Sequence, residues 1–140
     1  MPELNGTTAD TSQDLAVLEL TDNAALRNTL AMRLAETKRP DVLTVLLRLI
    51  SKPELSNARA TLVHCLGFYN LADHFDLLVG LVASGNWEVA HEAHGLLSSI
   101  EEVNGDDVAK AYDLIKGLLY QGVPDGWRKD LLQDLLSMFE

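Results

Sequence analysis

The sequence contains a single cysteine, Cys65. One thiol cannot form a disulfide within the chain, so we expect a fold held by its hydrophobic core in a reducing compartment. No apolar run reaches the roughly 18 residues of a membrane-spanning helix, because the richest one, Val42 to Ile50, is short and contains Arg48. The chain also opens without the basic and apolar segments of a signal peptide. These absences predict a soluble, cytoplasmic protein.

Basic residues are scarce in this chain. It has 11 Lys and Arg residues against 21 Asp and Glu residues, which gives a net charge of −10 and a pI near 4.7. Nucleic acids and anionic membranes are bound through Lys and Arg side chains that neutralise phosphates. We therefore predict that the protein binds neither nucleic acid nor membrane.

The length and the apolar content predict one folded domain. The chain has 140 residues, 47% of them hydrophobic, which suffices for one core but not for two. Its opening has almost no apolar side chains and includes Pro2, Asn5 and Gly6, so we predict that residues 1–12 are disordered. We predict that residues 13–140 form a single domain.

The apolar residues recur with the period of a helix. Leu26, Leu30 and Leu34 follow one another at intervals of four, and no strand-like alternation occurs anywhere. Turn and helix-start residues separate helical stretches of roughly 10 to 18 residues. These breaks are Thr21-Asp22, Arg39-Pro40-Asp41, Ser51-Lys52-Pro53-Glu54, Ser84-Gly85-Asn86, Asn104-Gly105-Asp106 and Gly122-Val123-Pro124-Asp125-Gly126.

The pattern also repeats on a larger scale. A shift of about 34 residues places Val45 over Val79 and Leu62 over Leu96, and a shift of about 37 places Leu78 over Ile115. Each repeat is a pair of helices that is too small to bury its own apolar face. We therefore predict an all-α fold: a short right-handed α-solenoid of stacked antiparallel helical hairpins, with about 7 to 8 helices.

One segment resembles a known repeat. The second helix of a HEAT-like repeat commonly opens Trp/Pro-x-Val-Arg-x-x-Ala before Leu-Leu. A similar segment here is Asn86-Trp87-Glu88-Val89-Ala90-His91-Glu92-Ala93-His94-Gly95-Leu96-Leu97. The resemblance covers about Pro40 to Glu140. Ala90 stands where the pattern has arginine. The resemblance therefore does not imply that an Asp–Arg ladder links the repeats of this chain.

No residue pattern supports catalysis. Some HEAT-like hydroxylases bind two iron ions through several His-Glu pairs, but His91-Glu92 is the only such pair in this chain. His64 and Cys65 are adjacent, and adjacent helical side chains point about 100° apart, so they do not form a nucleophile–base pair. We predict a protein that is not an enzyme and that has no metal and no cofactor.

Acidic residues concentrate late in the chain. Residues 85–140 carry 11 acidic and 4 basic side chains, and thus seven of the ten net negative charges. This excess forms either a solvated face that keeps the protein soluble or a field that steers a basic partner onto the helices. In stacked hairpins the second helices line the concave side. We predict that Glu88, Glu92, Glu101 and Glu102 carry recognition of the partner, and that Asn57 and His91 are neutral hydrogen-bonding contacts. The full set of predicted partner-binding residues is Glu54, Asn57, His64, Glu88, His91, Glu92, Glu101 and Glu102. For Trp87 and Trp127 we expect packing between repeats.

Build and charge suggest a function. A small, acidic chain of this kind resembles the HEAT-like immunity proteins of bacterial toxin systems. The resemblance implies one protein partner, a basic nuclease-type toxin domain whose active site is blocked by carboxylates in place of substrate phosphates. The alternative is a HEAT-like adaptor or assembly chaperone, akin to the family that attaches chromophores. We expect the free protein to be a monomer.

Overall fold

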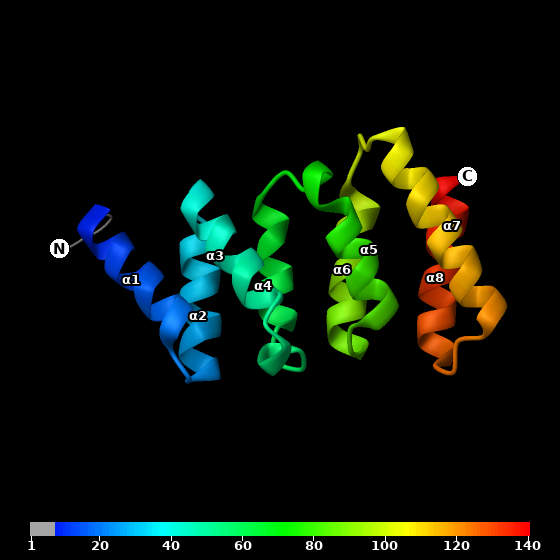
Figure 1. Cartoon of the computed structure of the whole chain (residues 1–140). Coiled ribbons are helices and arrows are strands. Elements are labelled where there is room, and N and C mark those ends of the chain that lie inside the picture. The colour runs from blue at the N-terminus through cyan, green and yellow to red at the C-terminus, as the bar shows by residue number, and fades with distance from the viewer. Residues whose placement is uncertain (1–7) are drawn as a thin grey trace. The chain divides into compact units, whose positions relative to one another are not determined.

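The computed structural model describes residues 8–140, which form eight α-helices and no strand (Figure 1). The helices are α1 (Thr8–Leu20), α2 (Ala24–Ala35), α3 (Pro40–Ile50), α4 (Ala60–Cys65), α5 (Phe75–Ser84), α6 (Trp87–Ser99), α7 (Gly105–Gln121) and α8 (Gly126–Phe139). Three short 3₁₀ helices are η2 (Pro53–Leu55), η3 (Leu66–Phe68) and η4 (Ala72–His74). The predicted fold class, a short α-solenoid of helical hairpins, is confirmed. Within residues 8–140, no helix combines the length and the apolar character needed to cross a bilayer.

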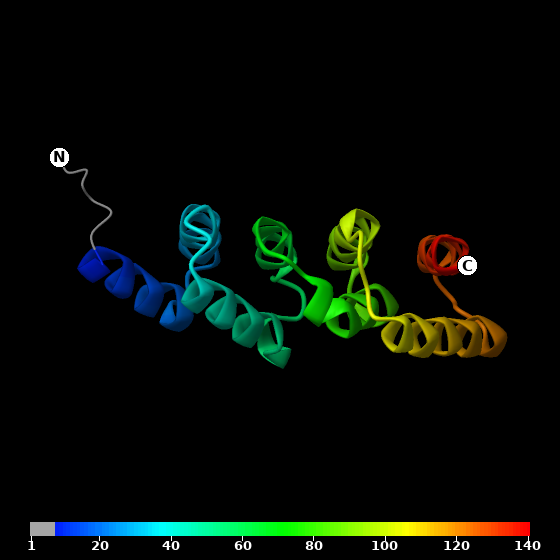
Figure 2. The ribbon, with the colours of Figure 1, turned by 90° about the horizontal axis from the view of Figure 1, so that it is seen from above.

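The chain divides into two compact units, residues 1–69 (unit 1) and residues 70–140 (unit 2). In unit 1, α1 and α3 form one layer and α2 and α4 the other (Figure 2). Contacts join α1 to α2 and α3 to α4 within hairpins, and α2 to α4 between them. The buried apolar side chains include Leu18, Leu30, Leu34, Val42, Leu46, Leu49, Ile50, Leu62 and Val63.

Unit 2 is built in the same way. Helices α5 and α7 form one layer, α6 and α8 the other, and α5 contacts all three of its neighbours (Figure 2). Its buried apolar side chains include Phe75, Leu78, Val79, Val82, Val89, Ala93, Leu97, Ile115, Leu132 and Leu135. Each unit thus buries one hairpin against another. The prediction that residues 13–140 form a single domain stays a prediction.

Most helix ends lie at the predicted breaks. The side chains of Asn23, Asn86 and Asn104 each accept a backbone N–H in the first turn of α2, α6 and α7. Such caps satisfy donors that the helix itself cannot pair. Pro40 is the first residue of α3, a position where its missing N–H removes no helical hydrogen bond. Gly122 follows α7 with a φ of 99°, which glycine adopts without strain.

Two segments have structure that was not predicted from the sequence. Helix α1 begins at Thr8, within the segment 1–12 that was predicted to be disordered, and residues 1–7 lie outside the described part of the chain, so the disorder stays a prediction. The polar residues before Leu15 lack an apolar period, but extending an existing helix adds one hydrogen bond for each residue ordered. The break between η3 and η4 was not predicted. The apolar residues continue through it and it contains no proline, so the sequence pattern gives no sign of it.

Arginine side chains fasten helix ends in both units. Arg27 donates to the carbonyl of Thr21 at 2.8 Å, after the end of α1, and Arg59 donates to the carbonyl of Ile50 at 2.7 Å, the last residue of α3. Arg128 of α8 donates to the carbonyls of Val82 and Gly85 at the end of α5, both at 2.8 Å. The last carbonyls of a helix have no helical partner and carry a partial negative charge. A guanidinium there donates the missing hydrogen bonds and compensates that charge.

Candidate protein-binding surface

Three of the predicted partner-binding residues lie in unit 1. Glu54 is exposed in η2, Asn57 is exposed in the turn that follows, and His64 is exposed on α4. The concave side predicted for them is formed by second helices, but Glu54 and Asn57 precede the helix α4, and their role in binding a partner stays a prediction. Pro53 opens a 3₁₀ turn and α4 begins only at Ala60, so the stretch that carries Glu54 and Asn57 is not part of that helix.

The other five predicted residues lie in unit 2 but at two places. Glu88, His91 and Glu92 are on α6, whereas Glu101 and Glu102 are in the connection to α7. Helix α6 ends at Ser99, eleven positions after Glu88 and seven after Glu92, which correspond to about 17 Å and about 11 Å at the rise of a helix. The predicted carboxylates therefore form two groups, one on the first half of α6 and one beyond its end.

A stack of planar side chains joins the starts of α6 and α8. The ring centroids of Trp87 and His91 are 4.0 Å apart with planes inclined by 31°, and the rings of His91 and Trp127 are 5.7 Å apart. The guanidinium of Arg128 lies 4.4 Å from the centre of the Trp127 ring. We call these four side chains the planar stack. It combines contacts within each helix with one contact, His91 to Trp127, between the two hairpins of unit 2.

Hydrogen bonds hold the stack in place at two points. The Nδ1–H of His91 donates to the carbonyl of Trp87 at 2.7 Å, one helical turn back. Arg128 is bound to the two carbonyls at the end of α5 and also lies 3.5 Å from Asp125, and its side chain is only 14% exposed. Prediction from sequence missed the stack, although Asp125 and Arg128 at a spacing of three were a visible signal.

A hydrogen bond forms a second link between α6 and α8. The Nε2 atom of His94 lies 2.7 Å from a carboxylate oxygen of Asp134, forty positions along the chain. We call the surface formed by Trp87, Glu88, His91, Glu92, His94, Trp127 and Asp134 the α6–α8 surface. Packing between repeats, expected for both tryptophans, is confirmed for Trp127, whereas Trp87 stacks on its own helix and stays 55% exposed.

Charge is divided unevenly between the two units. Residues 1–69 carry 8 acidic and 7 basic side chains, and residues 70–140 carry 13 acidic and 4 basic ones. In unit 1 several opposite charges meet: Arg48 donates to Glu19 at 2.7 and 3.1 Å, and Arg39 donates to Asp41 at 2.8 and 3.1 Å. These hydrogen bonds lower the pKa of Glu19 and of Asp41. Unit 2 has too few cations to balance its carboxylates in this way.

Comparison with known proteins places this arrangement in a family. The sequence profile of HEAT repeats matches residues 15–98, which is more than half of the chain. The chain belongs to the HEAT repeat family. The matched region starts earlier than the predicted resemblance, at α1, and ends within α6. Neither the curated proteins nor the solved structures contain a match to it.

HEAT repeats form protein-interaction scaffolds, and we therefore describe this chain as a protein-interaction module of that family. Within residues 8–140, no three His, Cys, Asp or Glu side chains gather where they could hold a metal ion. His91 directs its Nδ1 atom to a backbone carbonyl and its ring to two tryptophans. The predicted lack of a cofactor and of catalytic activity stays a prediction.

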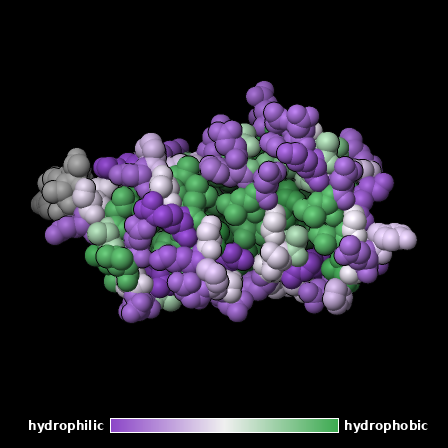
Figure 3. Space-filling view, in the orientation of Figure 1, coloured by the Kyte–Doolittle hydropathy of each residue, from purple (hydrophilic) through white to green (hydrophobic). Residues whose placement is uncertain are grey.

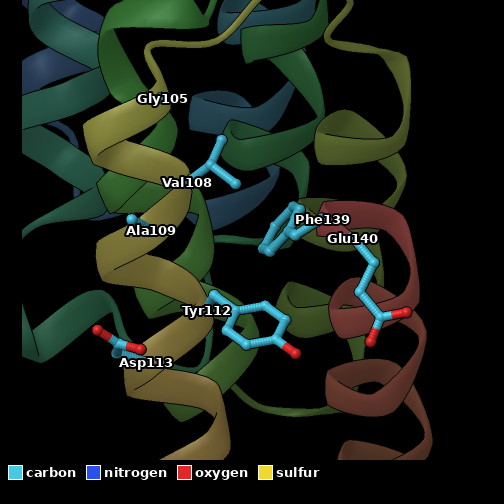
Figure 4. Close-up of a pocket in the computed structure, with 7 residues that line it drawn as sticks. All are labelled: Gly105, Val108, Ala109, Tyr112, Asp113, Phe139 and Glu140. Carbon is cyan, nitrogen blue, oxygen red and sulfur yellow. The ribbon is translucent and has the colours of Figure 1, made fainter.

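The hairpin formed by α7 and α8, beyond the matched region, contains a hollow of about 430 Å³ (Figure 4). The side chains of Val108, Tyr112 and Phe139 point into the space between the two helices, with Glu140 at its rim. Apolar surface is visible among hydrophilic side chains over α5 and α7 of this unit (Figure 3). The lining of the hollow is mostly apolar, with the carboxylates of Asp113 and Glu140 beside it.

Proposed function

We propose that this HEAT-repeat protein is a non-catalytic module that binds one basic protein partner on the α6–α8 surface. The observation that carries the proposal is the net charge of unit 2, which has 13 acidic side chains and only 4 basic ones. One of those four, Arg128, is held by backbone carbonyls at the end of α5, and Lys116 lies 5.3 Å from the ring of Tyr112. The carboxylates of the unit therefore present a strong net negative field to solvent.

Such a field acts mainly on the approach of the partner. Complementary charge raises the association rate and orients the encounter more than it raises final affinity. Affinity then comes from a few well-ordered anchors at short range. The α6–α8 surface combines both properties, because Glu88 is exposed beside the planar stack.

A basic nuclease-type toxin domain is the partner that we propose, with the protein acting as its immunity protein. Carboxylates would then occupy sites that bind substrate phosphates in the toxin. The adaptor or assembly-chaperone function is the alternative, and the separation of Glu88 and Glu92 from Glu101 and Glu102 favours it. An adaptor has no need to gather its carboxylates at one place, whereas an inhibitor that replaces phosphates does.

Co-expression with the products of the neighbouring reading frames separates these functions. If one product stops growth when expressed alone, and this protein both restores growth and co-elutes with it, the immunity function is supported. A neighbour that co-elutes without being toxic supports the adaptor function instead. If no neighbouring product binds and pull-down with cationic protein domains also fails, the proposed binding of a basic partner is overturned.

The contribution of the α6–α8 surface is tested by reversing charge in the variant Glu88→Lys/Glu92→Lys. We expect association with the partner to slow about tenfold or more at low salt and to change little at 1 M salt, where the Debye length falls to about 3 Å. The matched control is Glu101→Lys/Glu102→Lys, which changes net charge equally but beyond the C-terminal end of α6. If the control slows association as much as the first variant, or if neither does, this surface is not the binding site.

A further inference from the structure

Trp87 is an exposed aromatic side chain at the outer end of the planar stack. It is the first residue of α6, and it is 55% exposed. The imidazole of His91 covers one side of its ring at a centroid distance of 4.0 Å. The exposed area therefore belongs to the opposite face and the edge of the indole, which a ligand can reach.

The surroundings hold this indole in a defined orientation. His91 is bound to the backbone of Trp87 through its Nδ1 atom, and its ring contacts Trp127 of the next hairpin. Trp127 is in turn covered by Arg128, which is fixed by two carbonyls. An aromatic side chain that is already ordered loses little conformational freedom when a partner binds, which is typical of binding hot spots.

The other tryptophan of the stack shows which group fits such a face. The guanidinium of Arg128 lies 4.4 Å from the centre of the Trp127 ring, and a carboxylate oxygen of Asp125 lies 3.5 Å from the same guanidinium. At Trp127, an indole, the cation stacked on it and a carboxylate that pairs with the cation thus lie together. At Trp87 the indole is present, and the exposed carboxylate of Glu88 is its neighbour in the chain, but the described residues supply no cation to its open face.

We propose that the open face of Trp87 receives an arginine side chain of the protein partner. The guanidinium stacks on the indole, and the negative charge of Glu88, the next residue of α6, attracts it through the field rather than through a shared contact. Arginine fits better than lysine, because its planar and weakly hydrated cation stacks on aromatic rings. This inference rests on the proposed function, since it names the chemistry by which the α6–α8 surface recognises a basic partner.

A peptide probe tests the contact directly by NMR. The probe is a short acetylated peptide with two arginines separated by glycine, and its control carries the neutral isostere citrulline at both positions. We expect the arginine peptide to shift the indole N–H signal of Trp87, assigned with the variant Trp87→Phe, more than that of Trp127. Equal shifts with the citrulline peptide, or no shift of the Trp87 signal at saturating peptide, would overturn the inference.

A second test uses the protein partner identified by co-expression. The variant Trp87→Ala is expected to weaken its binding about tenfold, as loss of a desolvated cation–π contact implies, and Glu88→Gln is expected to weaken it less. The matched control is Leu114→Ala, which removes another exposed apolar side chain of unit 2 that is 49% exposed and lies outside the stack. Circular dichroism checks that each variant is folded.

These two tests separate the inference from the proposed function. A partner that binds Trp87→Ala as tightly as the unchanged protein overturns the inference and leaves the proposed function standing. A specific response to the arginine peptide, in a protein for which no basic protein partner is found, supports the inference and removes the proposed function.

Discussion

Replacing Arg128 by methionine should destabilise unit 2 by about 3 kcal/mol. The substitution removes two hydrogen bonds of 2.8 Å from a cation to the carbonyls of Val82 and Gly85. A hydrogen bond made by a charged group contributes roughly 1.5–3 kcal/mol. Methionine retains the length of the aliphatic stem, so the loss reports on the guanidinium rather than on packing.

Smaller terms adjust this value. The guanidinium also lies over the Trp127 ring, and such contacts contribute about 0.5–2 kcal/mol. The ion pair with Asp125 adds little, because the Asp125 side chain is 49% exposed. Against these terms, water reaches part of the freed carbonyls once the side chain shortens. The two hydrogen bonds together contribute roughly 3–6 kcal/mol. Because water replaces part of them in the variant, we expect a loss at the lower end of this range, about 3 kcal/mol.

Urea unfolding measures this loss in the correct part of the molecule. Both tryptophans lie in unit 2, so their fluorescence follows that unit, whereas circular dichroism at 222 nm follows the helices of both. The midpoint by fluorescence should fall with an unchanged slope. Lys129→Met removes a neighbouring exposed cation and serves as the control, with little expected effect. A loss below about 0.5 kcal/mol for Arg128→Met, or an equal loss for the control, would refute the anchoring role.

Three further substitutions test the packing and the electrostatics. Gly85→Ala should destabilise unit 2 by about 1–3 kcal/mol in the same urea assay, because a Cβ there would lie 2.6 Å from both the Leu81 carbonyl oxygen and Val89 Cγ1. Gly95→Ala on α6, where a Cβ meets nothing within 4 Å, should instead stabilise it by about 0.5–1 kcal/mol, and equal effects would contradict the packing described. Arg48 lowers the pKa of Glu19, so the stability that this pair adds is present above the ordinary pKa of about 4 and is lost as pH falls through the lowered value. Thermal melts by circular dichroism should therefore show a smaller decline between pH 5 and pH 3 for Glu19→Gln than for the unchanged protein.

The helical fold could be predicted because its causes are local. Leucines at intervals of four define buried faces, as Leu30 and Leu34 do, and asparagine caps define the starts of α2, α6 and α7. The break between η3 and η4 could not be predicted in this way. Leu66, Leu71 and Phe75 are all buried on either side of it, so the apolar pattern continues where the helix does not.

The candidate surface was only partly predictable. Glu88, His91 and Glu92 do share one helix, since their spacing fixes their place on it once the helix is known. Glu54 and Asn57 do not lie on the second helix of their hairpin, because a correspondence between repeats assumes equal helix starts and α4 begins late. The planar stack depends on how α6 meets α8 about forty positions later, and the spacing of Asp125 and Arg128 indicates only the ion pair at the start of α8, not that contact.

The unequal charge of the two units also bears on how each one folds. Like charges repel one another in the compact state, so unit 2, with 13 acidic and 4 basic side chains, folds against its own repulsion, whereas the nearly balanced unit 1 does not. Added salt screens this repulsion and stabilises unit 2 selectively. Under the proposed function, a basic partner bound to unit 2 would offset the same repulsion, so that its binding and the folding of unit 2 would be thermodynamically linked.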